Sequence, residues 1–137
     1  TQWLTLIIGS TTIKRVHLAD CHLSPLQHTP VIALLLKHNH ILELLDLYNN
    51  QFSAKDIDIL LQGFIHNTDS HVHTLLLGDN PFSTEGLAHV VHALLRKQNR
   101  IKSLDLSACQ LDDESAKYIA KLIEQNKHLT VLNLNSN

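Results

Sequence analysis

The sequence predicts an α/β solenoid, with parallel strands on a concave face and helices on a convex face. An eleven-residue phrase begins at residues 13, 42, 72 and 101, and a fifth copy that begins at 129 stops at its ninth position, so the copies start 28 to 30 residues apart. Positions 4 and 6 of each phrase are apolar, as in a short strand with one buried side. Between the phrases the apolar spacing becomes that of a helix. Self-similarity at this period is typical of repeat proteins whose units stack on one another.

Each phrase is predicted to form a strand followed by a turn. Position 9 is always asparagine or cysteine: Cys21, Asn50, Asn80, Cys109 and Asn137. A small side chain that donates hydrogen bonds is needed where a turn inside the stack holds carbonyl groups away from water. Both cysteines are therefore interpreted as structural. They lie three repeats apart, at least about 14 Å for stacked strands, so no disulfide is expected between them.

The segments between the phrases are predicted to be helices. Ser53 and Ser83 are predicted N-caps, and Asp56 follows the first of them at the third helical position. Thr29 is predicted to cap a helix that begins with Pro30, because proline is favoured in the first turn. Each helix should direct its apolar pairs towards the strands.

Those inward positions are Leu60, Leu61, Phe64, Ile65, Val90, Val91, Leu94, Leu95, Ile119, Leu122 and Ile123. An asparagine, which tolerates positive φ, is expected to end each helix: Asn39, Asn67, Asn99 and Asn126. Charges also fit the helix dipole. Acids open the last helix at Asp113 and Glu114, and basic residues lie near helix ends at Lys37, His38, Arg96, Lys97, Lys121 and His128.

The phrase Leu-x-x-Leu-x-Leu-x-x-Asn/Cys-x-Leu resembles the leucine-rich repeat family over residues 13–137. The repeat length with a full helix resembles the ribonuclease-inhibitor-like type, which is also found in NOD-like receptors. The resemblance implies a horseshoe segment. Its departures are Phe52 and Phe82 in place of leucine, a helix glycine only at Gly86, and two additional residues around 68–71.

We predict a single leucine-rich repeat domain over residues 1–137. Residues 1–12 are interpreted as the tail of a preceding repeat or an N-terminal cap helix, because Trp3, Leu4, Ile7 and Ile8 have helical spacing. Terminal repeats need a polar cap, and neither end of this sequence has one. A piece of a larger protein is therefore expected.

Composition restricts the function. The 137 residues are 44% hydrophobic and 18% charged, as in a folded domain, and carry a formal net charge of −2. We expect neither nucleic acid nor an anionic membrane as partner, and the apolar runs are too short to span a bilayer. No signal peptide is visible, so a cytoplasmic location is expected, or the host cytoplasm for a secreted effector.

Enzyme signatures are missing from the sequence. It contains neither the G-x-S-x-G motif nor a phosphate-binding G-x-x-x-x-G-K-[S/T] loop. A repeat stack also offers a shallow concave face in place of a deep pocket. We therefore expect no enzyme activity, no cofactor and no small-molecule substrate.

A protein partner is expected to bind the concave face. Stacking aligns the outward strand positions into columns, and the predicted binding residues are Arg15, His17, Leu44, Asp46, Tyr48, Thr74, Leu76, Ser103, Asp105 and Asn133. Tyr48 is the best candidate anchor, since aromatic residues are enriched in binding hot spots. The alternative is an unengaged surface tyrosine. Asp20, Asp46, Asp79 and Asp105 make the face mildly acidic, which would suit a partner with a basic patch.

The eleven histidines allow a second hypothesis. The pairs are His38 with His40, His71 with His73, and His89 with His92. They would suit a metal- or pH-responsive regulatory domain that uses a His-rich edge. No HExxH motif is present, and ordinary surface histidines are the simpler interpretation. The favoured function is a protein-interaction module, within a larger scaffold, receptor or bacterial effector.

Overall fold

The computed structural model describes residues 2–96 and 99–137, and Lys97 lies outside them. Strands and helices alternate along the chain, and the strands form a parallel sheet in the order β1-β2-β3-β4-β5. The elements are α1 (Gln2–Ile8), β1 (Arg15–His17), α2 (Pro25–His38), β2 (Leu44–Asp46), α3 (Ala54–His66), β3 (Thr74–Leu76), α4 (Ser83–Leu94), β4 (Ser103–Asp105), the 3₁₀ turn η1 (Asp113–Ser115), α5 (Ala116–Gln125) and β5 (Val131–Asn133).

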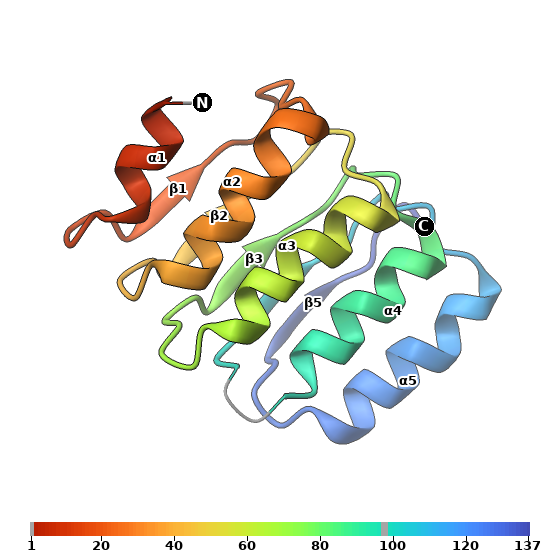
Figure 1. Cartoon of the computed structure of the whole chain (residues 1–137). Helices are drawn as coiled ribbons and strands as arrows, with labels where there is room; N and C mark the ends of the chain where they lie inside the picture. The colour runs from red at the N-terminus through yellow and green to blue at the C-terminus, as the bar shows by residue number, and fades with distance from the viewer. Residues whose placement is uncertain (1, 97–98) are drawn as a thin grey trace.

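The helices lie on one side of the sheet in chain order (Figure 1). Helices need about 10 Å of width each, whereas neighbouring strands are about 4.8 Å apart. This difference in width curves a stack towards its strands. The α/β leucine-rich repeat solenoid predicted from the sequence is confirmed. The division into repeats starting at 13, 42, 72, 101 and 129, within one domain, stays a prediction.

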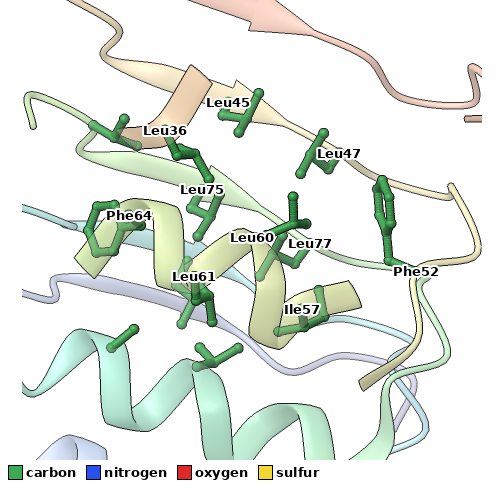
Figure 2. Packing of buried hydrophobic residues seen from close by; sticks show 14 of the residues in the cluster. Leu36, Leu45, Leu47, Phe52, Ile57, Leu60, Leu61, Phe64, Leu75 and Leu77 are labelled. Atoms are coloured by element: carbon green, nitrogen blue, oxygen red, sulfur yellow. The ribbon is translucent and has the colours of Figure 1, made fainter. Parts of the chain in front are cut away.

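The core lies between the sheet and the helices. Leu45 and Leu75 at position 4, with Leu47 and Leu77 at position 6, are almost fully buried. In Figure 2, Leu60 of α3 lies towards these strand residues. Burial of each such side chain stabilises the fold by about 1.5 to 3 kcal/mol. The two phenylalanines that replace leucine, Phe52 and Phe82, are also fully buried.

Position 9 forms a ladder of side-chain hydrogen bonds along one edge of the sheet. Asn80 donates to the carbonyl oxygens of Leu47, Leu77 and Gly78, at 2.9 to 3.1 Å. Its Oδ1 accepts from the backbone N–H of Asn50 and of Phe52, both at 3.0 Å. The predicted role of this position is confirmed, because Asn80 satisfies buried backbone groups in two adjacent repeats.

The cysteines at position 9 have different environments. Cys109 is buried, and its thiol lies 3.4 Å from the carbonyl oxygen of Leu77 and 3.3 Å from that of Ser107. Cys21 belongs to the first strand's turn and is exposed. Both thiols are free, as predicted.

A second asparagine ladder follows the opposite edge, and it corrects one prediction. Asn39, Asn67 and Asn126 are helix C-caps with φ of −86°, −94° and −81°, so the expected positive φ is wrong. Their side chains act instead: Nδ2 of Asn67 donates to the carbonyl oxygens of Leu36 and Asn39. Positive φ occurs at Ser83, the first residue of α4, and in the strand turns, at Asp20, His22, Asn49, Gln51, Asp79, Ala108, Gln110 and Ser136.

The fourth asparagine lies further from its helix than predicted. Helix α4 ends at Leu94 with Leu95 as its C-cap, so Asn99 does not end the helix. Asn99 still donates to the carbonyl oxygen of Leu94, at 2.6 Å. The Asn99 side chain therefore binds a carbonyl oxygen at the end of α4, although the helix does not extend to Asn99.

Two predicted helix starts are wrong. Helix α2 begins at Pro25, five residues earlier than predicted, so Thr29 does not cap it. Proline fits the first position of a helix because the N–H it lacks would have no partner within the helix there. Thr29 is buried within α2 and donates to Asp56 of α3 at 3.2 Å, while Pro30 lies on the exposed side. Helix α4 begins at Ser83 with Phe82 as its N-cap, and the N-cap makes no side-chain hydrogen bond.

One further prediction for the helices is confirmed, at the start of α3, and one is wrong, at Ile123 of α5. Ser53 and Asp56 form a capping box at the start of α3, as predicted. Ile123 is predicted to face the strands, but 64% of it is exposed. It lies with Ile119 and Leu134 at the side of α5 away from α4.

Segment 2–8 forms α1, which packs on α2 and buries Leu4 completely. The predicted helix is confirmed, and its role as a repeat tail or a cap stays a prediction. No helix in the described residues is long and apolar enough to cross a membrane.

Candidate protein-binding surface

The concave face is the side of the sheet that the helices leave uncovered. We define it by the outward strand residues and the residue two positions after the end of each strand, such as Tyr48 after β2. The register aligns Arg15, Leu44, Thr74, Ser103 and Val131 in one column, and His17, Asp46, Leu76, Asp105 and Asn133 in the next. All ten side chains are exposed or half-buried. The structure therefore brings the predicted strand residues together on one surface, although 28 to 30 residues separate neighbours along the chain.

Tyr48 follows β2 and lies across the neighbouring repeat. A Cβ atom added to Gly78 would come within 2.9 Å of Cδ2 and of Cε2 of the Tyr48 ring, and within 2.7 Å of Oγ of Ser107. The ring therefore occupies the space that a side chain at position 78 would need. Sequence reasoning missed this role of Gly78, because no pattern along the chain connects the glycine with Tyr48.

The tyrosine hydroxyl lies in an acidic environment. Partial burial of the side chain raises the pKa of Tyr48 above its usual value, and the carboxylates of Asp79, Asp105 and Asp20 raise it further. The hydroxyl is therefore protonated at neutral pH and can donate a hydrogen bond. A tyrosine in this setting presents an apolar ring and a polar tip, as anchors of protein interfaces do.

Asp46, the last residue of β2, is an aspartate of the concave face whose side chain is mostly buried. The Asp46 side chain is 14% exposed, and its Oδ1 accepts from the backbone N–H of Tyr48 at 3.1 Å. Its Oδ2 lies 3.3 Å from Nδ1 of His17. Asp105 repeats the turn, since its Oδ1 accepts from the N–H of Ser107 at 2.8 Å. These aspartates therefore support the turns as well as giving the face its charge.

The other edge of the concave face carries mixed charge. Lys14 pairs with Glu43 at 3.0 Å, and Nε2 of His73 lies 3.8 Å from the same carboxylate. The hydrogen bond from Lys14 is the largest cause that lowers the pKa of Glu43. Arg15 is exposed beside them. Lys14, Arg15 and His73 therefore surround the carboxylate of Glu43 where the strands begin.

Four histidines contact carboxylates of a neighbouring repeat. The pairs are His17 with Asp46 at 3.3 Å, His40 with Asp69 at 4.0 Å, His73 with Glu43 at 3.8 Å and His89 with Asp58 at 3.3 Å. The described part of the chain holds no group of three or more His, Cys, Asp or Glu side chains that could bind a metal ion. The histidines therefore form pairwise contacts between repeats.

Known proteins share both the repeat and the fold. A sequence profile described as "Leucine Rich repeat" matches residues 99–120. The protein "NACHT, LRR and PYD domains-containing protein 5" of Mus musculus is 28% identical over 96 residues, which are 70% of this chain and 8% of the mouse protein. This chain thus spans only a small part of that relative's length.

The solved structure of "Leiomodin-1 Actin-Binding Site 2 (ABS2)" has the same fold. It aligns with a TM-score of 0.82 and 19% sequence identity, covering 97% of this chain and 77% of the other. The parallel register, the asparagine ladder and these similarities lead to one conclusion: the chain has the fold of a leucine-rich repeat solenoid, and residues 99–120 match the leucine-rich repeat profile.

Proposed function

We propose that this chain recognises a protein partner through its concave face, as part of a larger scaffold, receptor or bacterial effector. One observation supports the surface: aromatic and apolar side chains gather on a sheet face that no described element of the fold covers. Tyr48, Leu44 and Leu76 remain partly accessible there, while the apolar strand positions on the opposite side are buried. Leucine-rich repeats and their structural relative support a protein-interaction module in general terms.

The composition of the face suits such a role. Apolar residues in its centre are surrounded by polar ones, including Thr74, Ser103 and Asn133. Protein interfaces commonly combine an apolar centre with a polar rim. The leiomodin-1 structure is that of an actin-binding site. At 19% identity the likeness carries the fold alone, so the partner is inferred from this chain's own surface.

A pH-responsive role for the His-rich edge is the second candidate. Three histidines from the pairs of this edge, His40, His73 and His89, contact carboxylates of a neighbouring repeat, and protonation of an imidazole there would change the charge between repeats. It would act beside partner recognition and not in place of it.

The test compares what three immobilised proteins capture from a cell extract. These are the wild type, a concave double variant (Leu44→Ala with Tyr48→Ala), and a convex double variant (Leu26→Ala with Leu34→Ala). Leu26 and Leu34 of α2 are 89% and 46% exposed, so the convex variant removes comparable apolar surface elsewhere. Circular dichroism and melting temperature check that all three are folded.

The concave variant should lose proteins that the wild type and the convex variant both retain. Identical capture by all three would contradict binding through this face.

A further inference from the structure

Leu76 lies between two carboxylates on the concave face. It is in register with Asp46 of β2 on one side and with Asp105 of β4 on the other. Neighbouring strands are about 4.8 Å apart, so the two aspartates belong to strands about 10 Å apart. The three side chains form a strip with an apolar centre and an acid at each end.

The charge of this strip is only partly compensated. Asp46 contacts His17, which is charged only when protonated. Asp105 uses Oδ1 for the turn bond to Ser107, and no described lysine, arginine or histidine forms an ion pair with it. Its Oδ2 therefore has the capacity to accept a hydrogen bond from a ligand.

Tyr48 lies beside this strip of three residues. Its ring lies over Gly78, the turn residue that follows β3, and its hydroxyl is close enough to Asp105 for that carboxylate to raise its pKa. Because Gly78 has no side chain, the Tyr48 ring can occupy the space above it. A flat aromatic face beside carboxylates is a favourable environment for a guanidinium or ammonium group.

We infer that the partner segment bound here carries an arginine or lysine, whose alkyl chain lies on Leu76 and whose cationic group lies between Asp46 and Asp105 beside Tyr48. Long basic side chains bury their methylene groups on apolar surface while the charged end stays polar. The inference rests on the proposed function, since it names the chemistry of the partner at that same surface. We call this site the cation cradle: Asp46, Tyr48, Leu76 and Asp105.

The same spacing excludes a metal ion as occupant. A calcium ion needs its oxygen ligands at 2.3 to 2.6 Å, and strands about 10 Å apart do not bring their carboxylates to one such point. A guanidinium group, which has five N–H donors spread over a plane, can reach towards both. The neighbouring Leu44 and Thr74 offer apolar and hydroxyl contacts to residues that flank the basic one.

The test uses two blocked nine-residue peptides that contain leucine and serine and differ only at three positions. One has arginine at these positions and the other has citrulline, which is similar in size but uncharged. Binding to the ¹⁵N-labelled protein is followed by NMR. The arginine peptide should shift the signals of the cradle residues, and the citrulline peptide should bind at least about tenfold more weakly.

Two variants with the same change in net charge provide the decisive comparison. Asp105→Asn should weaken binding of the arginine peptide at least about threefold. Asparagine can keep the turn bond, because Asn133 in the same column accepts from the N–H of Asn135 at 3.1 Å. Asp58→Asn on α3 is the control, and it should leave binding unchanged. Asp58 is 41% exposed and pairs with His89 away from the concave face.

Equal binding of the two peptides, or equal weakening by both variants, would overturn the cation cradle. Failure of the cradle can be separated from failure of the proposed function by the capture assay. If Asp105→Asn retains every protein that Leu44→Ala with Tyr48→Ala loses, the concave face binds a partner without using the cradle. If no concave variant changes capture, the proposed function itself is contradicted.

Discussion

Asn80 shows how one side chain closes the turn of its own repeat and connects it to the preceding repeat. It makes three donated and two accepted hydrogen bonds, all to backbone groups, and it is fully buried. The surrounding carbonyl and N–H groups have no access to water as a substitute. At this turn the amide therefore supplies hydrogen-bond partners for backbone groups that apolar packing cannot supply.

We expect Asn80→Ala to lower the free energy of unfolding by about 3 kcal/mol or more, because several buried backbone groups would lose their partner. Urea unfolding followed by circular dichroism measures the change. Asn135→Ala is the matched control, since Asn135 is exposed and should change stability by less than about 0.5 kcal/mol. Equal effects of both substitutions would contradict the role of the ladder.

Cys109 is the weaker member of the same ladder, and its thiol should be unreactive. Burial raises the pKa of the Cys109 thiol to about 12, and thiolate is the reactive form. At pH 8, a thiol reagent should label the exposed Cys21 rapidly and Cys109 only after unfolding. Mass spectrometry of labelled peptides distinguishes the two. Equal labelling rates in the native protein would contradict the buried position.

The same shift predicts lower stability in alkali. The folded state holds Cys109 as a neutral thiol, whereas the unfolded chain ionises it at its ordinary pKa near 9. The stabilising contribution is therefore complete below about pH 9 and is lost as the pH rises towards 12. Cys109→Asn, which restores the residue of neighbouring repeats, should reduce this slope in chemical unfolding measured from pH 8 to 11. An unchanged slope would show that other groups cause it.

At the scale of elements, the helix starts differ although their sequences look alike. Ser53 and Asp56 form reciprocal bonds at the start of α3, whereas the N-cap of α4 makes no side-chain hydrogen bond. We expect Ser53→Ala to cost about 1 kcal/mol and Ser83→Ala a few tenths at most. Thermal unfolding of the two variants checks this. A loss at Ser83 as large as that at Ser53 would mean that Ser83 caps α4 in solution.

Helices α2 and α3 approach closely at a glycine. A Cβ atom at position 63 would lie 2.1 Å from the carbonyl oxygen of Ala33, far inside a van der Waals contact. The backbone cannot move aside as a flexible side chain can. Gly63→Ala should therefore separate the helices and cost about 2 to 4 kcal/mol, although alanine favours helices in general.

Gly9→Ala is the control for this prediction, because an added Cβ at Gly9 meets nothing within 4 Å. Its stability in urea should equal that of the wild type within about 0.5 kcal/mol. If Gly63→Ala were equally neutral, the two helices would have to lie further apart than the structure places them.

At the scale of the whole molecule, charge depends on the histidines. The net charge of −2 counts all eleven as neutral, and acidification makes the molecule positive. The added positive charge repels a cationic partner segment. The arginine peptide should bind more weakly at pH 5.5 than at pH 7.5. Equal affinity at both values would contradict a pH-responsive interaction.

The repeat of 28 to 30 residues was sufficient to predict the solenoid, its strand columns and the role of position 9. Side-chain periodicity carries this information, because alternation places leucines inward whatever the neighbouring repeat contains. The ten predicted surface residues were also placed in columns correctly where they lie in strands. Their participation in binding stays a prediction.

Details that depend on contacts between repeats could not be read from the sequence. Thr29 resembles a helix cap but bonds to Asp56 of the next helix, and Gly78 resembles an ordinary turn residue but accommodates the ring of Tyr48. Ile123 has the spacing of a core residue, yet it is exposed because no described element covers that side of α5. Local pattern specifies which way a side chain points within its own strand or helix. Only the packing of one repeat on another specifies what it meets there.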